Sequence, residues 1–378
     1  MFSHVHRRIL FSLRDDDLRK GSKEATREEF RNRHGSIERH PYAVKWAEEI
    51  KEKKKVMLED PPQKCIESFR ESFEGRGKYL HFLRSADEAR ELILNIVGNE
   101  STVVKSKSLV GEEIELRQFL EGKGVKLYET DLGEFLVQLV NGRPAHMVTP
   151  AVNMTERKAR EVLYPLVKKR MDDVVSMVLE VRHFMRDKFL KANVGIIGAN
   201  ALAVDTGSIV FITNEGNGAL TSTLPEKIIV ITSIEKIYPT LQDAIKACVV
   251  QTVYAGFRNT TYIHIINGVP VDTSNGPREI HLIMLDNNRI RDDSLKETLY
   301  CIKCGSCQLS CPIFSEVDGS WGHIYTAAIG IPWTAITGDR SIARDLSYLC
   351  LQCGRCREVC PMKIDIPGLI LKIKRGRF

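Results

Sequence analysis

Eight of the ten cysteines lie in the last 78 residues, in two runs with the same pattern, C-x2-C-x2-C-x3-C-P. The first run contains Cys301, Cys304, Cys307 and Cys311, and the second contains Cys350, Cys353, Cys356 and Cys360. Thiolates at this spacing are typical ligands of [4Fe–4S] clusters, and in two-cluster proteins the fourth cysteine of each run ligates the other cluster. The pattern therefore predicts two [4Fe–4S] clusters.

The spacing also predicts which cysteine serves which cluster. The first three cysteines of a run share one short loop and can reach adjacent irons, whereas the fourth, followed by proline, points away. We therefore assign Cys301, Cys304, Cys307 and Cys360 to cluster 1, and Cys350, Cys353, Cys356 and Cys311 to cluster 2. Two zinc sites are the alternative, but zinc favours separated C-x2-C pairs around one ion. Clusters that exchange ligands lie close together, which favours a conductor of single electrons over a catalytic centre.

Composition limits where the protein acts and what it binds. No stretch approaches eighteen consecutive apolar residues, and the start, MFSHVHRRILFSLRDDD, is not a secretory signal. Clustered cysteines without an export signal indicate metal ligation in a reducing compartment, so we expect a cytoplasmic protein without a membrane span. The 55 basic and 49 acidic residues are interspersed, which argues against a nucleic-acid partner.

Short β-rich runs alternate with helical patterns over residues 81–290, which predicts an α/β domain with a mostly parallel sheet. A capping box at Ser85 and Glu88 opens the first helix of this region. The strands are expected at 102–105, 125–128, 146–149, 194–197, 208–213, 227–233, 262–266 and 279–285, and further helices at 112–120, 155–190 and 241–254.

Two other regions flank this domain. Residues 1–80 are rich in charge and in helix formers, so they are expected to form a helical N-terminal region packed on the main domain. After Asn288 the strand patterns stop, and residues 291–378 are predicted to be a helical ferredoxin-type domain that contains both cysteine runs.

Polar residues at predicted strand ends mark a candidate pocket, because open α/β sheets bind ligands at the carboxyl ends of their strands. Lys105 and Lys107 could hold an anion, and Glu134 and Asn214 lie at two further strand ends. Glu215, on a predicted turn, could act as an acid, a base or a nucleophile. Each segment could equally be a solvated strand end or a simple turn.

Several strings resemble the lactate-utilisation iron–sulfur protein family. They are VKSKS (104–108), ETDLGE (129–134), GAN (198–200), DTGS (205–208), TNEGN (213–217) and GPREIHLIMLD (276–286). The resemblance covers about residues 80–368 and implies an LUD domain, similar in fold to the NagB, ribose-phosphate isomerase and CoA-transferase group, fused to a helical ferredoxin domain with two clusters. It also implies two partners, a cysteine-rich subunit of the heterodisulfide-reductase type and a second LUD subunit.

Two features depart from the family pattern. The chain ends at Phe378, whereas family members often continue further, and Asn153 stands where histidine is expected. We expect Asn153 to cap the following helix together with Glu156.

The resemblance suggests an electron-transfer subunit of a complex that oxidises L-lactate or a related 2-hydroxyacid to the 2-oxoacid, with a small anion bound in the LUD domain. The alternative is a transferase or isomerase that acts on CoA-linked or phosphorylated substrates through Glu215, with the clusters sensory or structural. The residues leave open whether the LUD domain is itself catalytic.

Overall fold

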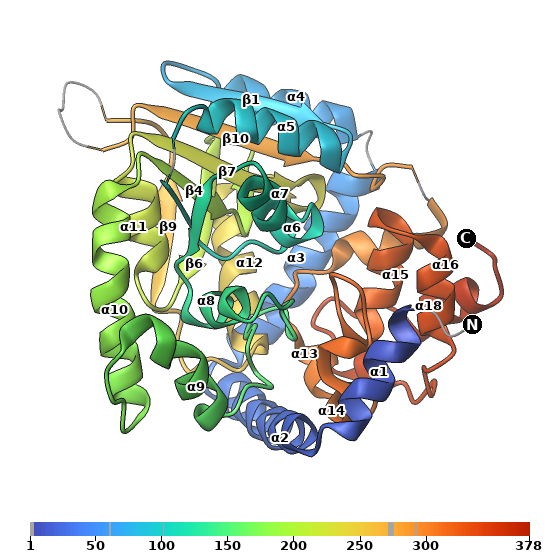
Figure 1. The fold of residues 1–378 in the computed structure, drawn as a ribbon. Coiled ribbons are helices and arrows are strands. Elements are labelled where there is room, and N and C mark those ends of the chain that lie inside the picture. Colours follow the sequence, from blue (N-terminus) through green and yellow to red (C-terminus); the bar gives the residue numbers. More distant parts are fainter. Residues whose placement is uncertain (1–3, 60–61, 101, 271–275, 292) are drawn as a thin grey trace.

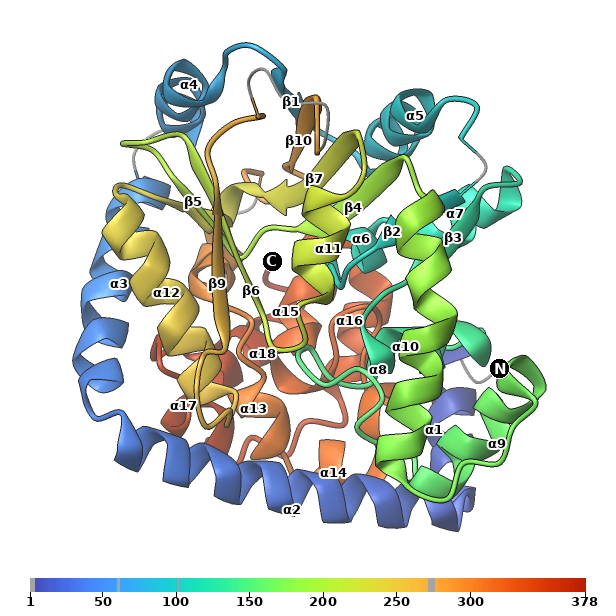
Figure 2. The same cartoon turned by 90° about the vertical axis from the view of Figure 1, so that its left-hand side faces the viewer.

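The computed structural model describes residues 4–59, 62–100, 102–270, 276–291 and 293–378 (Figure 1). The chain begins with four helices, α1 (His4–Arg14), α2 (Asp16–Arg39), α3 (Tyr42–Glu59) and α4 (Pro62–Phe73). Figure 2 shows α2 along the lower edge of the molecule, beneath the cysteine-rich helices. Within the described helices, none is both long and apolar enough to cross a membrane.

The main sheet has six strands, all parallel, in the order β1-β10-β7-β4-β2-β3. Their bounds are β1 (Lys78–Leu83), β2 (Thr102–Lys105), β3 (Lys126–Glu129), β4 (Val194–Gly198), β7 (Lys227–Ser233) and β10 (Glu279–Leu285). Neighbouring residues of the central strands face opposite sides and are buried on both. Ile229 and Ile231 pack against helices, whereas Ile228 and Val230 pack toward a second sheet. Burial on both faces is typical of a parallel sheet.

Helices and the second sheet cover the two faces of the main sheet. One face is covered by α5 (Ala86–Val97), α6 (Leu109–Glu113) and α7 (Leu116–Gly122). The second sheet has the order β8-β5-β6-β9, with β5 (Ala201–Ala203), β6 (Ser208–Thr213), β8 (Ile237–Tyr238) and β9 (Tyr262–Ile266). The remaining elements of the domain are α8 (Leu132–Leu139), α9 (Glu156–Val167), α10 (Val174–Lys191), α11 (Asn217–Thr223), η1 (Ile234–Lys236) and α12 (Leu241–Tyr254). The expected α/β domain with a parallel sheet is confirmed.

The cysteine-rich part is helical, as expected. It contains η2 (Asp293–Tyr300), α13 (Ser306–Leu309), α14 (Phe314–Val317), η3 (Asp318–Ser320), α15 (Ala327–Thr337), α16 (Arg340–Ser347), α17 (Arg355–Glu358) and α18 (Ile366–Lys374). No strand follows β10 in the described part of the chain. One hydrophobic core joins this domain to α3, α12 and the second sheet, so the two parts pack together rather than hang on a linker. The domain limits at 80/81 and 290/291 stay a prediction.

The N-terminal helix α2 contacts the cysteine-rich domain directly through charged side chains. Arg33 on α2 donates to Ser306 Oγ at 3.1 Å and to the Val359 carbonyl at 2.9 Å. Farther along the same helix, Arg19 and Lys23 pair with Glu316 at 3.1 and 2.8 Å. Residues almost 300 positions apart in the sequence are therefore in direct contact.

Four predictions of local structure are wrong. Residues 146–149 are not a strand, because their backbone bonds to side chains: Met147 N donates to Gln308 Oε1 at 3.1 Å. The helices predicted at 112–120 and 155–190 are each interrupted at a left-handed residue, Glu115 (φ 48°) and Lys168 (φ 53°). Asn153 does not cap α9: Thr155 does, and Asn153 instead donates to Asp318 at 3.0 Å.

Candidate metal centres and the adjoining cavity

Both cysteine runs form the same tight loop. In the first loop Lys303 (φ 59°) and Gly305 (φ 78°) flank Cys304, and in the second Gln352 (φ 55°) and Gly354 (φ 80°) occupy the equivalent positions. Left-handed residues at these positions turn the chain sharply. In the first loop, Lys303 N lies 3.3 Å from Cys301 Sγ, so backbone N–H groups point at the sulfurs. The third cysteine of each run then lies on a short helix, α13 or α17.

The eight cysteines line two separate cavities. One is lined by Cys301, Cys304, Cys307 and Cys360, and the other by Cys311, Cys350, Cys353 and Cys356. Each cavity thus takes three cysteines from one run and the fourth from the other, the division that the spacing predicts. The ligand assignment itself stays a prediction.

The chemistry of the two linings fits iron–sulfur clusters. Among the described residues, none with a charged side chain lines the first cavity besides its cysteines, and its other walls are largely apolar, with Met147, Ile329 and Ile364 among them. The second adds a single arginine, Arg355. Four soft thiolates without carboxylate or imidazole suit iron–sulfur clusters rather than hard cations. Cys353 is exposed, so the second cavity lies next to the surface.

A larger cavity of about 580 Å³ lies between the α/β domain and the first cysteine loop. Its walls include Met147, Cys301 and Ile302, which also line the first cysteine cavity. The two spaces therefore share a wall, and a molecule in the large cavity would lie against a predicted cluster ligand.

Of the predicted pocket residues, Lys107, Asn214 and Glu215 line this large cavity. Burial lowers the pKa of Lys107, whose ammonium donates to the Val148 carbonyl. Burial raises the pKa of Glu215, and the nearby Asp131 carboxylate raises it further. The other two predicted residues, Lys105 and Glu134, do not line the cavity, because their side chains are buried among other charged groups.

Sequence analysis missed three lysines of the cavity: Lys54 from the N-terminal α3, Lys236 at the end of η1, and Lys303 in the first cysteine loop. Burial, together with the charge of Lys303, lowers the pKa of Lys54 to about 8 and that of Lys236 to about 7. The buried face of α3 does carry a signal, since Ala47, Ile50, Lys54 and Leu58 follow one another at helical spacing. A lysine within such an apolar stripe indicates a buried charge with a specific role.

A buried network of charges connects the first cysteine loop to the α/β domain. Arg289, which follows β10, lies 2.6 Å from Glu113 and 2.8 Å from Glu235. Glu235 also pairs with Lys303, which stands between Cys301 and Cys304. We call these four residues, Glu113, Glu235, Arg289 and Lys303, the interdomain network. From the cysteine-rich domain, the Tyr325 hydroxyl adds a hydrogen bond of 2.6 Å to Glu113.

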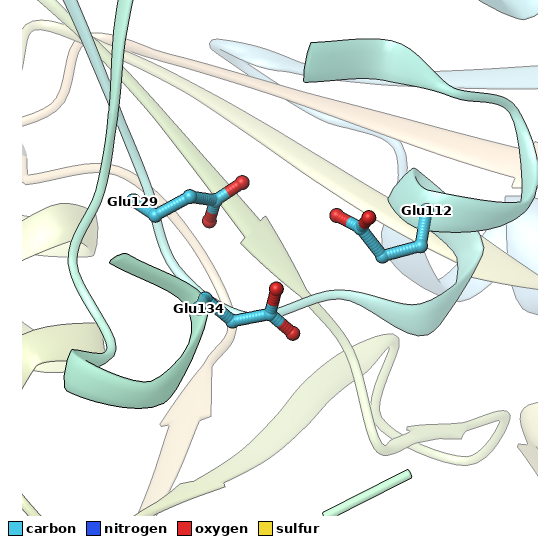
Figure 3. Close-up of side chains that lie close together, drawn as sticks. All are labelled: Glu112, Glu129 and Glu134. Carbon is cyan, nitrogen blue, oxygen red and sulfur yellow. The ribbon is translucent and has the colours of Figure 1, made fainter. Parts of the chain in front are cut away.

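A second buried group of charges contains Lys105 and Glu134. Figure 3 shows three carboxylates that lie close together, Glu112 from α6, Glu129 from β3 and Glu134 from α8. Lys105 Nζ lies 2.8 Å from Glu129 and 3.3 Å from Glu112. This ammonium already supplies the cation that buried carboxylates need, so we assign no metal to the triad.

Glu134 gives the triad an excess of negative charge, which predicts a pH-dependent effect. Burial raises its pKa well above the ordinary 4.5, and Glu112 and Glu129 raise it further; the pKa of Glu129 is raised to about 7. A raised carboxyl pKa means that stability is lost as the pH rises from 4.5 through the folded-state value. We expect Glu134→Gln to raise the midpoint of thermal unfolding at pH 8 and to change it little at pH 5.5.

The matched control for this prediction is Glu91→Gln, which changes an exposed glutamate on α5. We expect no difference between the two pH values for the control. A lower midpoint for Glu134→Gln at pH 8 would show that the Glu134 carboxylate stabilises the fold instead.

Comparisons with known proteins identify both domains. The LUD domain family matches residues 66–285, more than half of the chain, and the 4Fe-4S dicluster domain matches residues 297–364. The chain therefore belongs to the LUD domain family and carries a 4Fe-4S dicluster domain after the LUD domain. This is the architecture that the resemblance predicts.

The chain is similar, more particularly, to lactate utilization protein B. It is 34% identical over 310 residues to the protein of Bacillus subtilis (strain 168), covering 79% of this chain and 64% of that protein. It is 33% identical over 316 residues to the protein of Bacillus velezensis, covering 81% of this chain and 66% of that one. The chain thus spans just under two thirds of the length of these relatives. A solved DUF162 family protein from Deinococcus radiodurans aligns with a TM-score of only 0.32, at 15% identity over 60% of this chain and 98% of that one.

Proposed function

We propose that this protein is the iron–sulfur electron-transfer subunit of a cytoplasmic complex that oxidises L-lactate, or a related 2-hydroxyacid, to the 2-oxoacid. The observation that carries the proposal is the division of eight cysteines between two cavities, one beside the LUD cavity and the other at the surface. Each cluster, when bound, accepts and releases single electrons. The similarity to lactate utilization protein B supplies the substrate.

The positions of Cys301 and Cys353 define an inner and an outer end of the electron path through the two clusters. Cys301 forms the wall between the LUD cavity and the first cysteine cavity, whereas Cys353 opens the second cavity to the exterior. We assign Cys301, Cys304, Cys307 and Cys360 to the inner cluster, and Cys311, Cys350, Cys353 and Cys356 to the outer one. The oxidation releases two electrons and two protons for each 2-hydroxyacid, so two single-electron centres match its stoichiometry.

The surface around the outer cluster supports docking of a redox partner. Tyr348 and Leu351 are exposed beside Cys353, and the Lys374 ammonium lies over the Tyr348 ring at 5.2 Å. Residues 340–378 hold nine Lys and Arg against three Asp and Glu, so this stretch alone carries the formal charge of +6 of the whole chain. We propose that the cysteine-rich subunit docks here through an acidic face, and that the second LUD subunit completes the complex.

Anaerobic spectroscopy tests this function. Reconstituted protein is mixed with L-lactate, with and without candidate partner subunits, while the visible iron–sulfur absorbance is followed. We expect the absorbance to bleach only when the partners are present. Bleaching of the isolated chain would place the dehydrogenating site in its own LUD cavity.

An iron-loaded protein that L-lactate bleaches in neither mixture would contradict the proposal. The alternative would then be a transferase or isomerase that reacts through Glu215, which lines the cavity. Glu215→Gln would abolish turnover in that case.

A further inference from the structure

Three lysines gather at the end of the large cavity that faces the first cysteine loop. Lys54, Lys236 and Lys303 all line the cavity. Lys54 donates to the Glu235 carbonyl, Lys303 pairs with the Glu235 carboxylate, and Lys236 donates to the Ala199 carbonyl. They come from α3, from the LUD domain and from the cysteine loop, so the site is complete only when all three regions are packed together.

The buried groups at this end carry more positive than negative charge. Four basic side chains, Lys54, Lys236, Lys303 and Arg289, stand here against two carboxylates, Glu113 and Glu235, which pair with Arg289 and Lys303. Buried charges are costly unless they are compensated. Each lysine has three N–H donors, and the hydrogen bonds above use only part of this capacity.

The cavity also contains a second, more acidic group of side chains. Asp131 and Glu215 line it near Lys107, two acidic side chains against one basic one. An elongated molecule with one anionic end would therefore bind with that end inward, against the lysines and Cys301. The volume of about 580 Å³ is in the range of pockets for organic ligands and is large for a three-carbon acid.

We propose that this cavity is an anion site coupled to the inner cluster: it binds the carboxylate or phosphate group of an organic molecule against Lys54, Lys236 and Lys303, and it binds that group more weakly when the cluster is reduced. This inference rests on the proposed function, because the coupling requires the inner cluster. It adds a ligand site, a ligand class and a regulatory link to that function.

The physical basis of the coupling is competition for the same cations. A cluster held by four thiolates is itself an anion, and it gains a further negative charge on reduction. The bound anion and the cluster lie on opposite sides of the wall that Cys301 and Ile302 form. Added charge on one side must therefore weaken the binding of negative charge on the other, and linkage makes the effect reciprocal.

Anaerobic titration calorimetry of the iron-loaded protein tests the inference, with pyruvate and inorganic phosphate as separate probes. The protein is titrated oxidised and then reduced with methyl viologen radical, a cation that does not compete for the lysines. We expect at least one probe to bind the oxidised protein and to bind the reduced protein about fivefold or more weakly. The probe that binds more tightly distinguishes a carboxylate from a phosphate ligand.

Variants locate the site. Lys236→Met should weaken binding by about tenfold or more, since a hydrogen bond to a charged group is worth roughly 1.5–3 kcal/mol. Lys54→Met should act in the same direction. The matched control is Lys246→Met, because Lys246 pairs with Glu49 and does not line the cavity. Iron content and circular dichroism verify that each variant is folded and loaded.

The outcomes separate this inference from the proposed function. If neither probe binds the oxidised protein while the lactate assay still bleaches the clusters, the lysines serve the cluster alone and the inference is wrong. Equal affinity in both oxidation states, or binding that the lysine variants leave unchanged, overturns it as well. If the protein takes up no iron, the proposed function and the coupling are both wrong.

Discussion

A double variant, Cys301→Ala with Cys360→Ala, is expected to keep about half of the iron of the native protein, that is, about four of eight irons. The two residues lie in different runs, yet they line the same cavity. Removing both should therefore eliminate one cluster and spare the other. Each single variant should already show the whole loss, because one missing ligand is enough to disable the shared site.

The matched control is Cys301→Ala with Cys311→Ala, two cysteines of the same run that line different cavities. This variant is expected to lose nearly all of its iron. Total iron analysis and electron paramagnetic resonance of the reduced proteins distinguish the two results. If each run instead held its own cluster, the outcomes of the two double variants would be reversed.

The second large effect is expected at the centre of the interdomain network. Arg289→Met leaves the buried carboxylates of Glu113 and Glu235 without their main partner. Removing one member of a buried ion pair typically costs about 3–5 kcal/mol. We therefore expect a loss of this size in the free energy of unfolding, measured by denaturant titration of the iron-loaded protein under anaerobic conditions.

The pKa shifts of Glu113 and Glu235 determine how the loss of stability in Arg289→Met depends on pH. Burial would raise the pKa of Glu113 and Glu235, but Arg289 holds both below the ordinary 4.5, with help from Lys303. A lowered carboxyl pKa contributes stability above pH 4.5, and this stability is lost as the pH falls toward the folded-state values. In the variant, the unpaired buried carboxyls take up protons instead, so the loss should be larger at pH 8 than at pH 5.5.

The control for the network is Arg186→Met, which changes an exposed arginine on α10 and should alter stability by less than about 0.5 kcal/mol. A conservative variant, Arg289→Lys, should recover only part of the stability, since lysine cannot bond both carboxylates in the geometry of a guanidinium. A loss independent of pH would mean that Arg289 stabilises the protein by packing against Trp333 rather than by its charge.

The strands were predictable from the sequence where β-branched residues run continuously. β2, β6, β7, β9 and β10 begin and end at the predicted residues. Runs of β-branched and apolar residues are typical of the buried parallel strands of the main sheet and also occur in the antiparallel pair β6 and β9. The helix breaks at Glu115 and Lys168 were not predictable, since both residues are ordinarily poor at the left-handed conformation and adopt it only in the packed structure.

For the candidate site, the positions of residues close together in the sequence were predictable, whereas contacts between residues far apart in the sequence were not. The division of the cysteines could be anticipated because spacing along the chain controls which sulfurs can converge. The roles of Lys54 and Arg289 could not, because each depends on a partner far away in the sequence: Lys54 meets Glu235, and Arg289 meets Glu113. For Lys54 the apolar stripe of α3 indicates only that the side chain is buried. Lys105 was wrongly predicted to line the cavity, since Glu112 and Glu129, 7 and 24 residues further along the chain, pair with its ammonium.

The contact of α2 with the cysteine-rich domain has a consequence for biosynthesis. The ribosome releases α2 long before Ser306 and Val359, the partners of Arg33, have been translated. Until then α2 can pack only on the α/β domain, where Ser36 Oγ donates to the Phe257 carbonyl at 2.6 Å, and its contacts to the cysteine-rich domain form later. Because Arg33 reaches to the residues beside Cys307 and Cys360, we expect iron delivery to precede the final docking of α2. The first segment of the chain to be made is thus among the last to be fixed.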